Sequence, residues 1–160
     1  IRVKTDDRDN VRHGAKYFEW ERKGVPLRLE LGPRDIAKGQ AFAAPRTGGG
    51  KFGIPLDGIA EAVRAELDRQ QALLLQRAID ARDAKTYTVT SREHFDELLT
   101  DQPGFYRVPW GGNDDDEARI AEKTKATIRC FPMDQDSVEG LTCPLTGKPA
   151  HRWAIFSRAY

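Results

Sequence analysis

The sequence predicts an α/β chain in which a long helix joins two small domains. Residues 27–31 alternate leucine with charged residues, a pattern typical of a strand with one apolar face. Residues 57–84 carry apolar side chains at helical spacing, and short strand-like runs at residues 86–89 and 105–110 alternate with helical patterns. We therefore place the domain boundary near Lys85 and assign the domains to residues 1–84 and 85–160.

The first domain is predicted to open with a strand and a helix. Residues 1–5 alternate like a strand and lead into the charged segment 6–12. A helix follows from about Ala15 to Lys23, because Gly24 provides a C-terminal glycine.

The strand at residues 27–31 is predicted to pair with an antiparallel neighbour. Gly32 and Pro33 end this strand, and residues 39–45 supply its partner. Residues 46–50 contain three glycines and form the next loop. Neither of the common glycine-rich phosphate-binding patterns is present, so a flexible turn is favoured over a phosphate cradle.

The second domain is predicted to be a small α/β unit. Thr90 and Glu93 fit a capping box for a helix through Leu99, and four acids at residues 114–117 favour a helix start. Strands are expected at residues 86–89, 105–110, 127–131 and 153–157. The predicted core consists of large apolar side chains: Phe95, Leu98, Leu99, Phe105, Trp110, Ile120, Phe131, Trp153 and Phe156.

Composition excludes several classes of protein. The 160 residues carry a formal net charge of +1, so any nucleic-acid contact must be local. No apolar run approaches the roughly 20 residues needed to cross a bilayer, and we expect no signal peptide. Cys130 and Cys143 are too few for a disulfide framework, which indicates a reducing compartment, the cytosol.

Four side chains near the first helix and strand form the candidate site. A helix that ends where a strand begins can bring Tyr17, Glu21, Arg28 and Arg34 to one surface. An aromatic ring, a carboxylate and two guanidiniums suit single-stranded nucleic acid, whose bases stack on flat side chains and present donors and acceptors. The spacing is equally compatible with an ordinary solvated face.

Several motifs of this chain resemble one family. They are DDRD at residues 6–9, KYFEWERKGVPLRLELGPRD at residues 16–35, TIRCFP at residues 127–132 and the ending FSRAY. In the same order, they closely resemble the C-terminal part of prolyl-tRNA synthetases of the archaeal and eukaryotic type. The resemblance implies a class II anticodon-binding domain with a mixed sheet and flanking helices, which here lacks its first strand and helix. A C-terminal zinc-binding-like domain follows, and we expect the chain to be part of a longer protein.

The resemblance implies a function in translation. Such enzymes attach proline to tRNA(Pro) through a prolyl-adenylate, with ATP and Mg in a catalytic domain that lies outside this chain. The expected partners are the tRNA(Pro) anticodon, that catalytic domain and a second copy in a homodimer. Tyr17, Glu21, Arg28 and Arg34 match positions that contact anticodon bases in the family. Proline anticodons carry guanine at their second and third positions, and guanine offers donors to Glu21 and acceptors to the arginines.

The zinc site of the family is not preserved in the sequence. Many relatives hold zinc through four cysteines, and the matching positions here are Gly111, Asp116, Cys143 and Thr146. A structural zinc ion needs four good ligands, and glycine provides none. We therefore expect no zinc and a free thiol at Cys143.

No catalytic group is expected in this chain. Ser157 and His151 can be aligned as a nucleophile and base, but most such pairings are accidental. In relatives the carboxylate of a final tyrosine approaches the active site, and Tyr160 ends this chain in the same way, although a frayed end is the alternative. Two hypotheses remain: the C-terminal part of a prolyl-tRNA synthetase, or an independent α/β interaction module.

Overall fold

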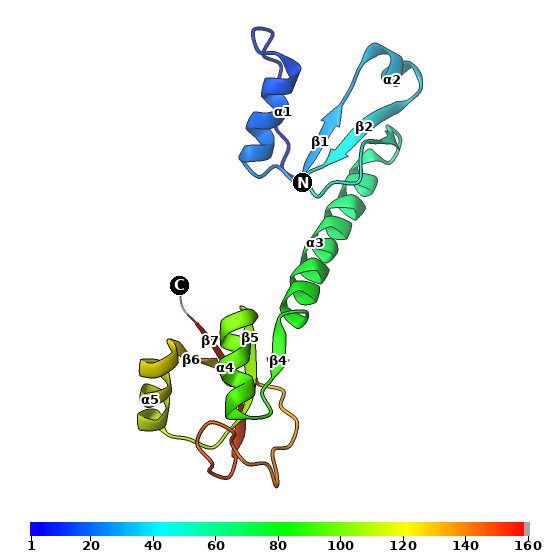
Figure 1. The fold of residues 1–160 in the computed structure, drawn as a ribbon. Helices are drawn as coiled ribbons and strands as arrows, with labels where there is room; N and C mark the ends of the chain where they lie inside the picture. Colours follow the sequence, from blue (N-terminus) through cyan, green and yellow to red (C-terminus); the bar gives the residue numbers. More distant parts are fainter. Residues whose placement is uncertain (159–160) are drawn as a thin grey trace. The chain divides into compact units, whose positions relative to one another are not determined.

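The computed structural model describes residues 1–158, and Tyr160 therefore lies outside the described residues. The chain forms two compact units, Ile1–Arg77 (unit 1) and Ala78–Tyr160 (unit 2), so the division falls inside the long helix α3 (Ile59–Asp83). The predicted α/β class is confirmed (Figure 1). Among the described residues, no helix has both the length and the apolar character that a membrane span requires.

Unit 1 consists of an antiparallel three-stranded sheet with helices around it. Helix α1 (His13–Arg22) precedes β1 (Leu27–Glu30), and the short α2 (Pro33–Ala37) leads to β2 (Gln40–Pro45) and β3 (Phe52–Pro55). The strand order is β1-β2-β3. The predicted helix and the first strand pair are confirmed, whereas α2 and β3 had not been predicted.

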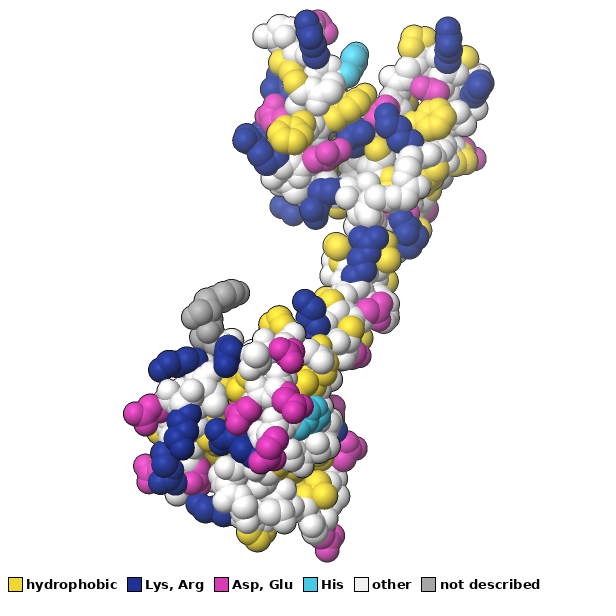
Figure 2. Space-filling view, in the orientation of Figure 1, with side chains coloured by type: hydrophobic (Ala, Val, Ile, Leu, Met, Phe, Trp, Pro, Cys, Tyr) yellow, Lys and Arg dark blue, Asp and Glu magenta, His cyan; other side chains and the backbone are white. Residues whose placement is uncertain are grey.

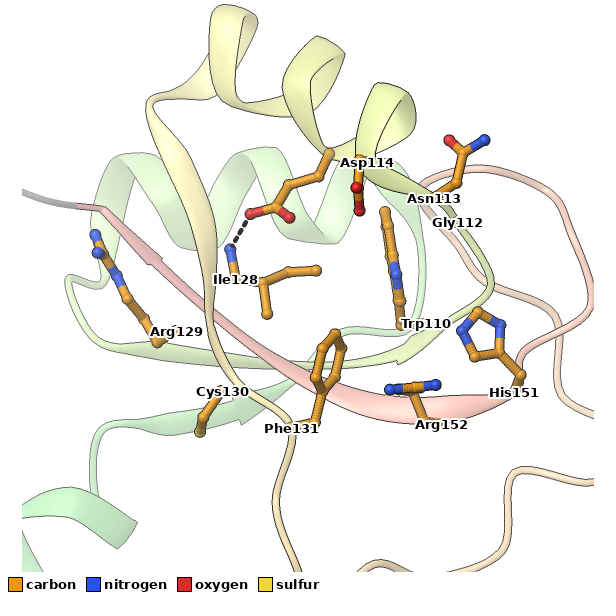
Figure 3. A pocket seen from close by; sticks show the side chains of 11 residues that line it. Trp110, Gly112, Asn113, Asp114, Ile128, Arg129, Cys130, Phe131, His151 and Arg152 are labelled. Atoms are coloured by element: carbon orange, nitrogen blue, oxygen red, sulfur yellow. Dashed lines mark hydrogen bonds between the residues drawn. The ribbon is translucent and has the colours of Figure 1, made fainter.

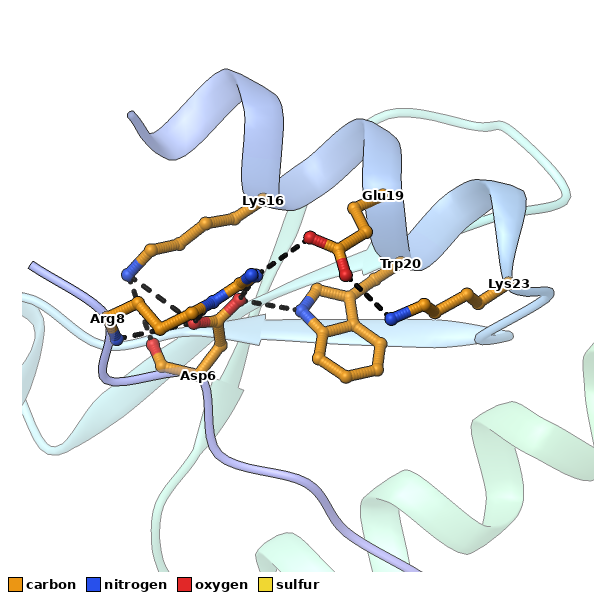
Figure 4. Close-up of polar contacts among 6 residues, drawn as sticks. All are labelled: Asp6, Arg8, Lys16, Glu19, Trp20 and Lys23. Carbon is orange, nitrogen blue, oxygen red and sulfur yellow. Dashed lines mark hydrogen bonds and ion pairs between the residues drawn. The ribbon is translucent and has the colours of Figure 1, made fainter. Parts of the chain in front are cut away.

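The expected strand at residues 1–5 is wrong. No strand among the described residues offers them a backbone partner, so they join no sheet, and all five are exposed. The segment is held through its side chains instead (Figure 4). Asp6 accepts hydrogen bonds from Trp20 Nε1 at 2.8 Å and from Arg8 Nη2 at 2.6 Å, and Arg8 also binds Glu19 at 2.9 Å. These bonds fasten residues 6–8 to α1.

The core of unit 1 lies between the sheet and the N-terminal half of α3. Ala43 and Ile54 from the sheet are buried against Val63, with Leu27, Ile59 and Leu67 packed around them. The apolar face predicted for β1 is not buried, since Leu29 and Leu31 are 36% and 56% exposed. Only Leu27 of these leucines packs against the core, and it is partly buried. On α3, Leu74 is also exposed although the helical spacing of apolar residues had suggested one buried face.

Unit 2 contains a mixed four-stranded sheet in the order β4-β5-β7-β6. Its elements are β4 (Thr86–Thr88), α4 (Arg92–Asp101), β5 (Phe105–Trp110), α5 (Asp114–Thr124), β6 (Ala126–Cys130) and β7 (Arg152–Arg158). Strands β4 and β5 are parallel, and the other pairs are antiparallel. Each predicted element is present. The cap of α4 is Ser91 rather than Thr90, since the Ser91 hydroxyl accepts the His94 N–H at 3.1 Å.

One face of this sheet forms the main core of unit 2. Opposite residues of β5 and β7, such as Tyr106 and Phe156, point to the same side and contact Phe95 of α4. Phe105 and Phe131 had been assigned to this core, but they are 38% and 40% exposed. Phe105 precedes the inward-facing Tyr106 in β5, and the alternation of the strand therefore turns its side chain outward.

Candidate nucleic-acid interface

The candidate interface is built on α1 and β1. Tyr17 and Glu21 lie one turn apart on α1, so they share a face of the helix. Arg28 and Glu30 lie two residues apart on β1, so they share a face of the strand. The short turn between α1 and β1 brings these two faces together.

Arg28 is the centre of the cluster. Its guanidinium lies 3.8 Å from the centre of the Tyr17 ring. It also donates hydrogen bonds to Glu21 at 2.9 Å and to Glu30 at 3.0 Å. The Arg28 side chain is only 18% exposed, whereas that of Glu21 is 52% exposed. Burial lowers the pKa of Arg28, but the hydrogen bonds to Glu30 and Glu21 outweigh burial and raise it overall.

Two further residues at this site were not identified from the sequence. Glu30 accepts a second ion pair, from Lys51 Nζ at 2.7 Å, and Lys51 Nζ lies 5.3 Å from the centre of the Tyr17 ring. Burial raises the pKa of Glu30, but the hydrogen bonds from Lys51 and Arg28 lower it below its ordinary value. The sequence could have indicated Glu30, because it lies two residues from Arg28 on the same face of β1. Lys51 is distant in the sequence and reaches this site only because the strands pair in the sheet. We call Tyr17, Glu21, Arg28 and Glu30 the Arg28 cluster, and Lys51 lies beside it.

Arg34 is placed apart from this network. It lies in α2 and is exposed, and it makes none of the hydrogen bonds, ion pairs or ring contacts described for the Arg28 cluster. The structure thus brings together Tyr17, Glu21 and Arg28. Trp20, on the same helix, is partly buried, and its indole N–H donates to Asp6.

The surface around the Arg28 cluster is mixed in charge. In the view of Figure 2, basic, acidic and hydrophobic side chains alternate over unit 1, and no large basic patch is seen on this face. A small hollow beside the cluster is lined by Glu21, Arg28 and Arg46 together with Trp20, Val25 and Ala44. The arrangement offers an aromatic ring, a guanidinium and carboxylates at one place, which suits a planar ligand with donors and acceptors on its edge.

The four positions that the resemblance assigns to zinc ligands lie on two segments of unit 2 that contact each other. The Thr146 hydroxyl donates to the Gly111 carbonyl at 3.4 Å, and Lys148 Nζ binds Asp116 at 2.5 Å. A Cβ atom on Gly111 would lie 2.3 Å from the Pro149 carbonyl oxygen, so no side chain fits there without a backbone shift. Cys143 is a free and fully buried thiol, as predicted for its redox state.

These residues do not fit a zinc ion. The Asp116 carboxylate is already bound by Lys148, by Arg119 and by the Asn113 N–H. These hydrogen bonds, that from Lys148 foremost, lower the pKa of Asp116 to about 2. No group of three His, Cys, Asp or Glu side chains suited to a metal ion occurs within residues 1–158.

A second hollow, of about 540 Å³, lies in unit 2 between the start of α5, β6 and β7 (Figure 3). Residues that line it include Trp110, Phe131, His151 and Arg152, and the Arg152 guanidinium lies 4.7 Å from the centre of the Phe131 ring.

The alignment of Ser157 with His151 as nucleophile and base is not supported by the structure. The Ser157 hydroxyl donates to the Gly104 carbonyl at 2.9 Å. Thus no contact links Ser157 to His151, and the structure supports no nucleophile and base here.

Comparisons with known proteins match two families, one in each part of the chain. Residues 1–66 match the family described as "Anticodon binding domain", and residues 92–160 match "Prolyl-tRNA synthetase, C-terminal". A proline-tRNA ligase of Chloroflexus aurantiacus is 45% identical over 163 residues, and one of Clostridium botulinum is 42% identical over 160. Each match covers 100% of this chain but only 33% of the relative. The chain belongs to the prolyl-tRNA synthetase family and corresponds to the C-terminal part of its members.

Proposed function

We propose that this chain reads the anticodon of tRNA(Pro) as the C-terminal part of a proline-tRNA ligase. The observation that carries the proposal is the Arg28 cluster, which lies within residues matched by the anticodon-binding family. Attachment of proline, with its ATP and Mg, belongs to a catalytic domain that this chain does not include. Assembly as a homodimer in the cytosol, and an approach of the Tyr160 carboxylate to the active site, are further parts of the proposal.

The free cluster already contains the groups that guanine requires. Guanine presents O6 and N7 as acceptors and N1–H and N2–H as donors. Arg28 supplies donors in a planar fork, and Glu21 supplies acceptors, and at present the two groups satisfy each other at 2.9 Å. A base that enters must replace this ion pair.

The ion pair that a base must replace is weak compared with what a base contact can discriminate. An ion pair with a half-exposed member, such as Glu21, contributes less than about 1 kcal/mol. A good bidentate contact to a base contributes about 1–3 kcal/mol of discrimination. Bases also stack on guanidinium planes as they do on aromatic rings, and the Tyr17–Arg28 stack provides both.

The test uses the full-length protein with tRNA(Pro) and with tRNA(Pro) whose second anticodon base is changed from guanine to adenine. Arg28→Ala and Glu21→Ala should each reduce the preference for the correct tRNA about 5- to 150-fold, which corresponds to about 1–3 kcal/mol. Arg64→Ala, at an exposed position of α3, is the control. Proline activation without tRNA should not change. An unaltered preference in both variants would refute the assignment.

A further inference from the structure

The loop between β2 and β3 lies beside the Arg28 cluster and has an open backbone. Its three glycines, Gly48, Gly49 and Gly50, have φ angles of 88°, 99° and 82°, a region that other residues rarely adopt. A Cβ atom at any of them would meet no atom within 4 Å. The glycines are therefore required by the path of the chain rather than by close packing, and the space next to them is free.

Two cations, Arg46 before the three glycines and Lys51 after them, lie beside different members of the Arg28 cluster. Lys51 follows the glycines, and its Nζ binds Glu30 and lies 5.3 Å from the Tyr17 ring. Arg46 precedes them and lines the small hollow with Glu21 and Arg28, while its backbone N–H is fixed to the Pro26 carbonyl at 2.9 Å. The Arg46 side chain is exposed, and that of Lys51 is 46% exposed.

Charge balance indicates what these two cations do. Glu21, Glu30 and Arg28 together carry a net charge of minus one, and a polyanion such as RNA would be repelled by that arrangement. Arg46 and Lys51 change the sum to plus one. Base edges require donors and acceptors in a fixed pattern, which Arg28 and Glu21 supply, whereas phosphates require only positive charge.

We propose that Arg46 and Lys51 bind the phosphodiester backbone on either side of the bases read by the Arg28 cluster. This inference rests on the proposed function and adds a second class of contact to it. Arg46 and Lys51 supply affinity that does not depend on the anticodon sequence, and the Arg28 cluster supplies the selection. The three glycines between the two cations present no side chain of their own to an approaching RNA backbone.

The experiment measures Kd as a function of salt for the full-length protein with the two tRNAs described above. Arg46→Gln and Lys51→Gln each remove one charge, and Lys123→Gln, on α5 of unit 2, removes one charge elsewhere. Each of the first two variants should reduce the slope of log Kd against log salt by about 0.7–0.9, the value for one phosphate contact. The ratio of affinities for the two tRNAs should stay the same. Circular dichroism confirms that each variant is folded.

The outcomes separate this inference from the proposed function. The phosphate assignment would be overturned if the Arg46 and Lys51 variants keep the wild-type slope. It would also be overturned if Lys123→Gln lowers the slope as much as they do. A change in the affinity ratio would overturn it too, since it would show base reading. If instead Arg28→Ala and Glu21→Ala leave the ratio intact while the slope falls as expected, the backbone contacts stand and anticodon reading by the cluster fails.

Discussion

Phe95 should hold unit 2 together without a metal ion. Its side chain is fully buried, and its ring packs edge-on against Tyr106 at 5.6 Å and Phe156 at 6.0 Å between centres. Truncation of such a residue to alanine costs about 3–5 kcal/mol, because contacts are lost and a cavity remains. Single domains are stable by only about 5–15 kcal/mol, so Phe95→Ala should remove a large part of the total.

The matched control is Phe131→Ala. Phe131 follows β6, is 40% exposed and packs beside Arg152, so its removal should cost less than about 1 kcal/mol. For a domain of this size, 1 kcal/mol corresponds to roughly 4–8 °C in Tm, and Phe95→Ala should therefore lower Tm by roughly 12–40 °C. Fluorescence of Trp110 and Trp153, which both lie in unit 2, follows the transition.

The same melts with and without a chelator complete the test. A structural zinc ion can contribute roughly 10–16 kcal/mol to folding, so its removal would exceed the effect of any single core substitution. We expect the chelator to leave Tm unchanged in the wild type. The reasoning fails if the chelator lowers Tm as much as Phe95→Ala does, or if Phe95→Ala is no more harmful than Phe131→Ala.

Three further predictions concern the Asp116 ion pairs and their surroundings. Lys148→Met should lower the Tm of unit 2 but leave the preference between the two tRNAs unchanged, because it leaves the buried Asp116 carboxylate with fewer partners. Gly111→Cys should also lower Tm and should not create a zinc site, as elemental analysis would show, because its Cβ would collide with the Pro149 carbonyl. The pKa of Asp116 falls from an ordinary 3.8 to about 2 in the folded chain, so its stabilisation is complete above about pH 4 and is lost as pH falls toward 2. Asp116→Asn should make stability depend less on pH in that range, and an unchanged acid profile would contradict this.

Local sequence patterns predicted most of the elements but not the contacts between distant segments. Alternation in residues 27–31 placed Arg28 and Glu30 on one side of β1, and both now bind each other at 3.0 Å. Lys51 lies 21 residues beyond Glu30, and the two meet only because β2 folds back beside β1 and β3 folds back beside β2. No periodicity within a single element encodes that meeting.

The same distinction explains the errors in the predicted cores. Large apolar residues were assigned to the interior by type, although Phe105 precedes the inward-facing Tyr106 and its position in the strand already directed it outward. The strand expected at residues 1–5 fails for another reason. An alternating pattern is necessary for a half-buried strand, but the strand forms only where a neighbour accepts its backbone hydrogen bonds.

We propose that the Lys148 ammonium takes the structural role that the resemblance assigns to a metal in many relatives, with different sensitivities. Lys148 links the loop that contains Cys143 to the start of α5, because its carbonyl accepts the Cys143 N–H at 2.8 Å while its Nζ binds Asp116. Asp116 also accepts the Asn113 N–H at 3.1 Å, so one carboxylate both caps the helix and holds the loop. A zinc centre depends on deprotonated thiolates and is lost to chelators or oxidants. An ion pair depends instead on an ionised carboxylate and is weakened by acid and salt. The stability of unit 2 should accordingly respond to pH and ionic strength, and be indifferent to reagents that remove metals.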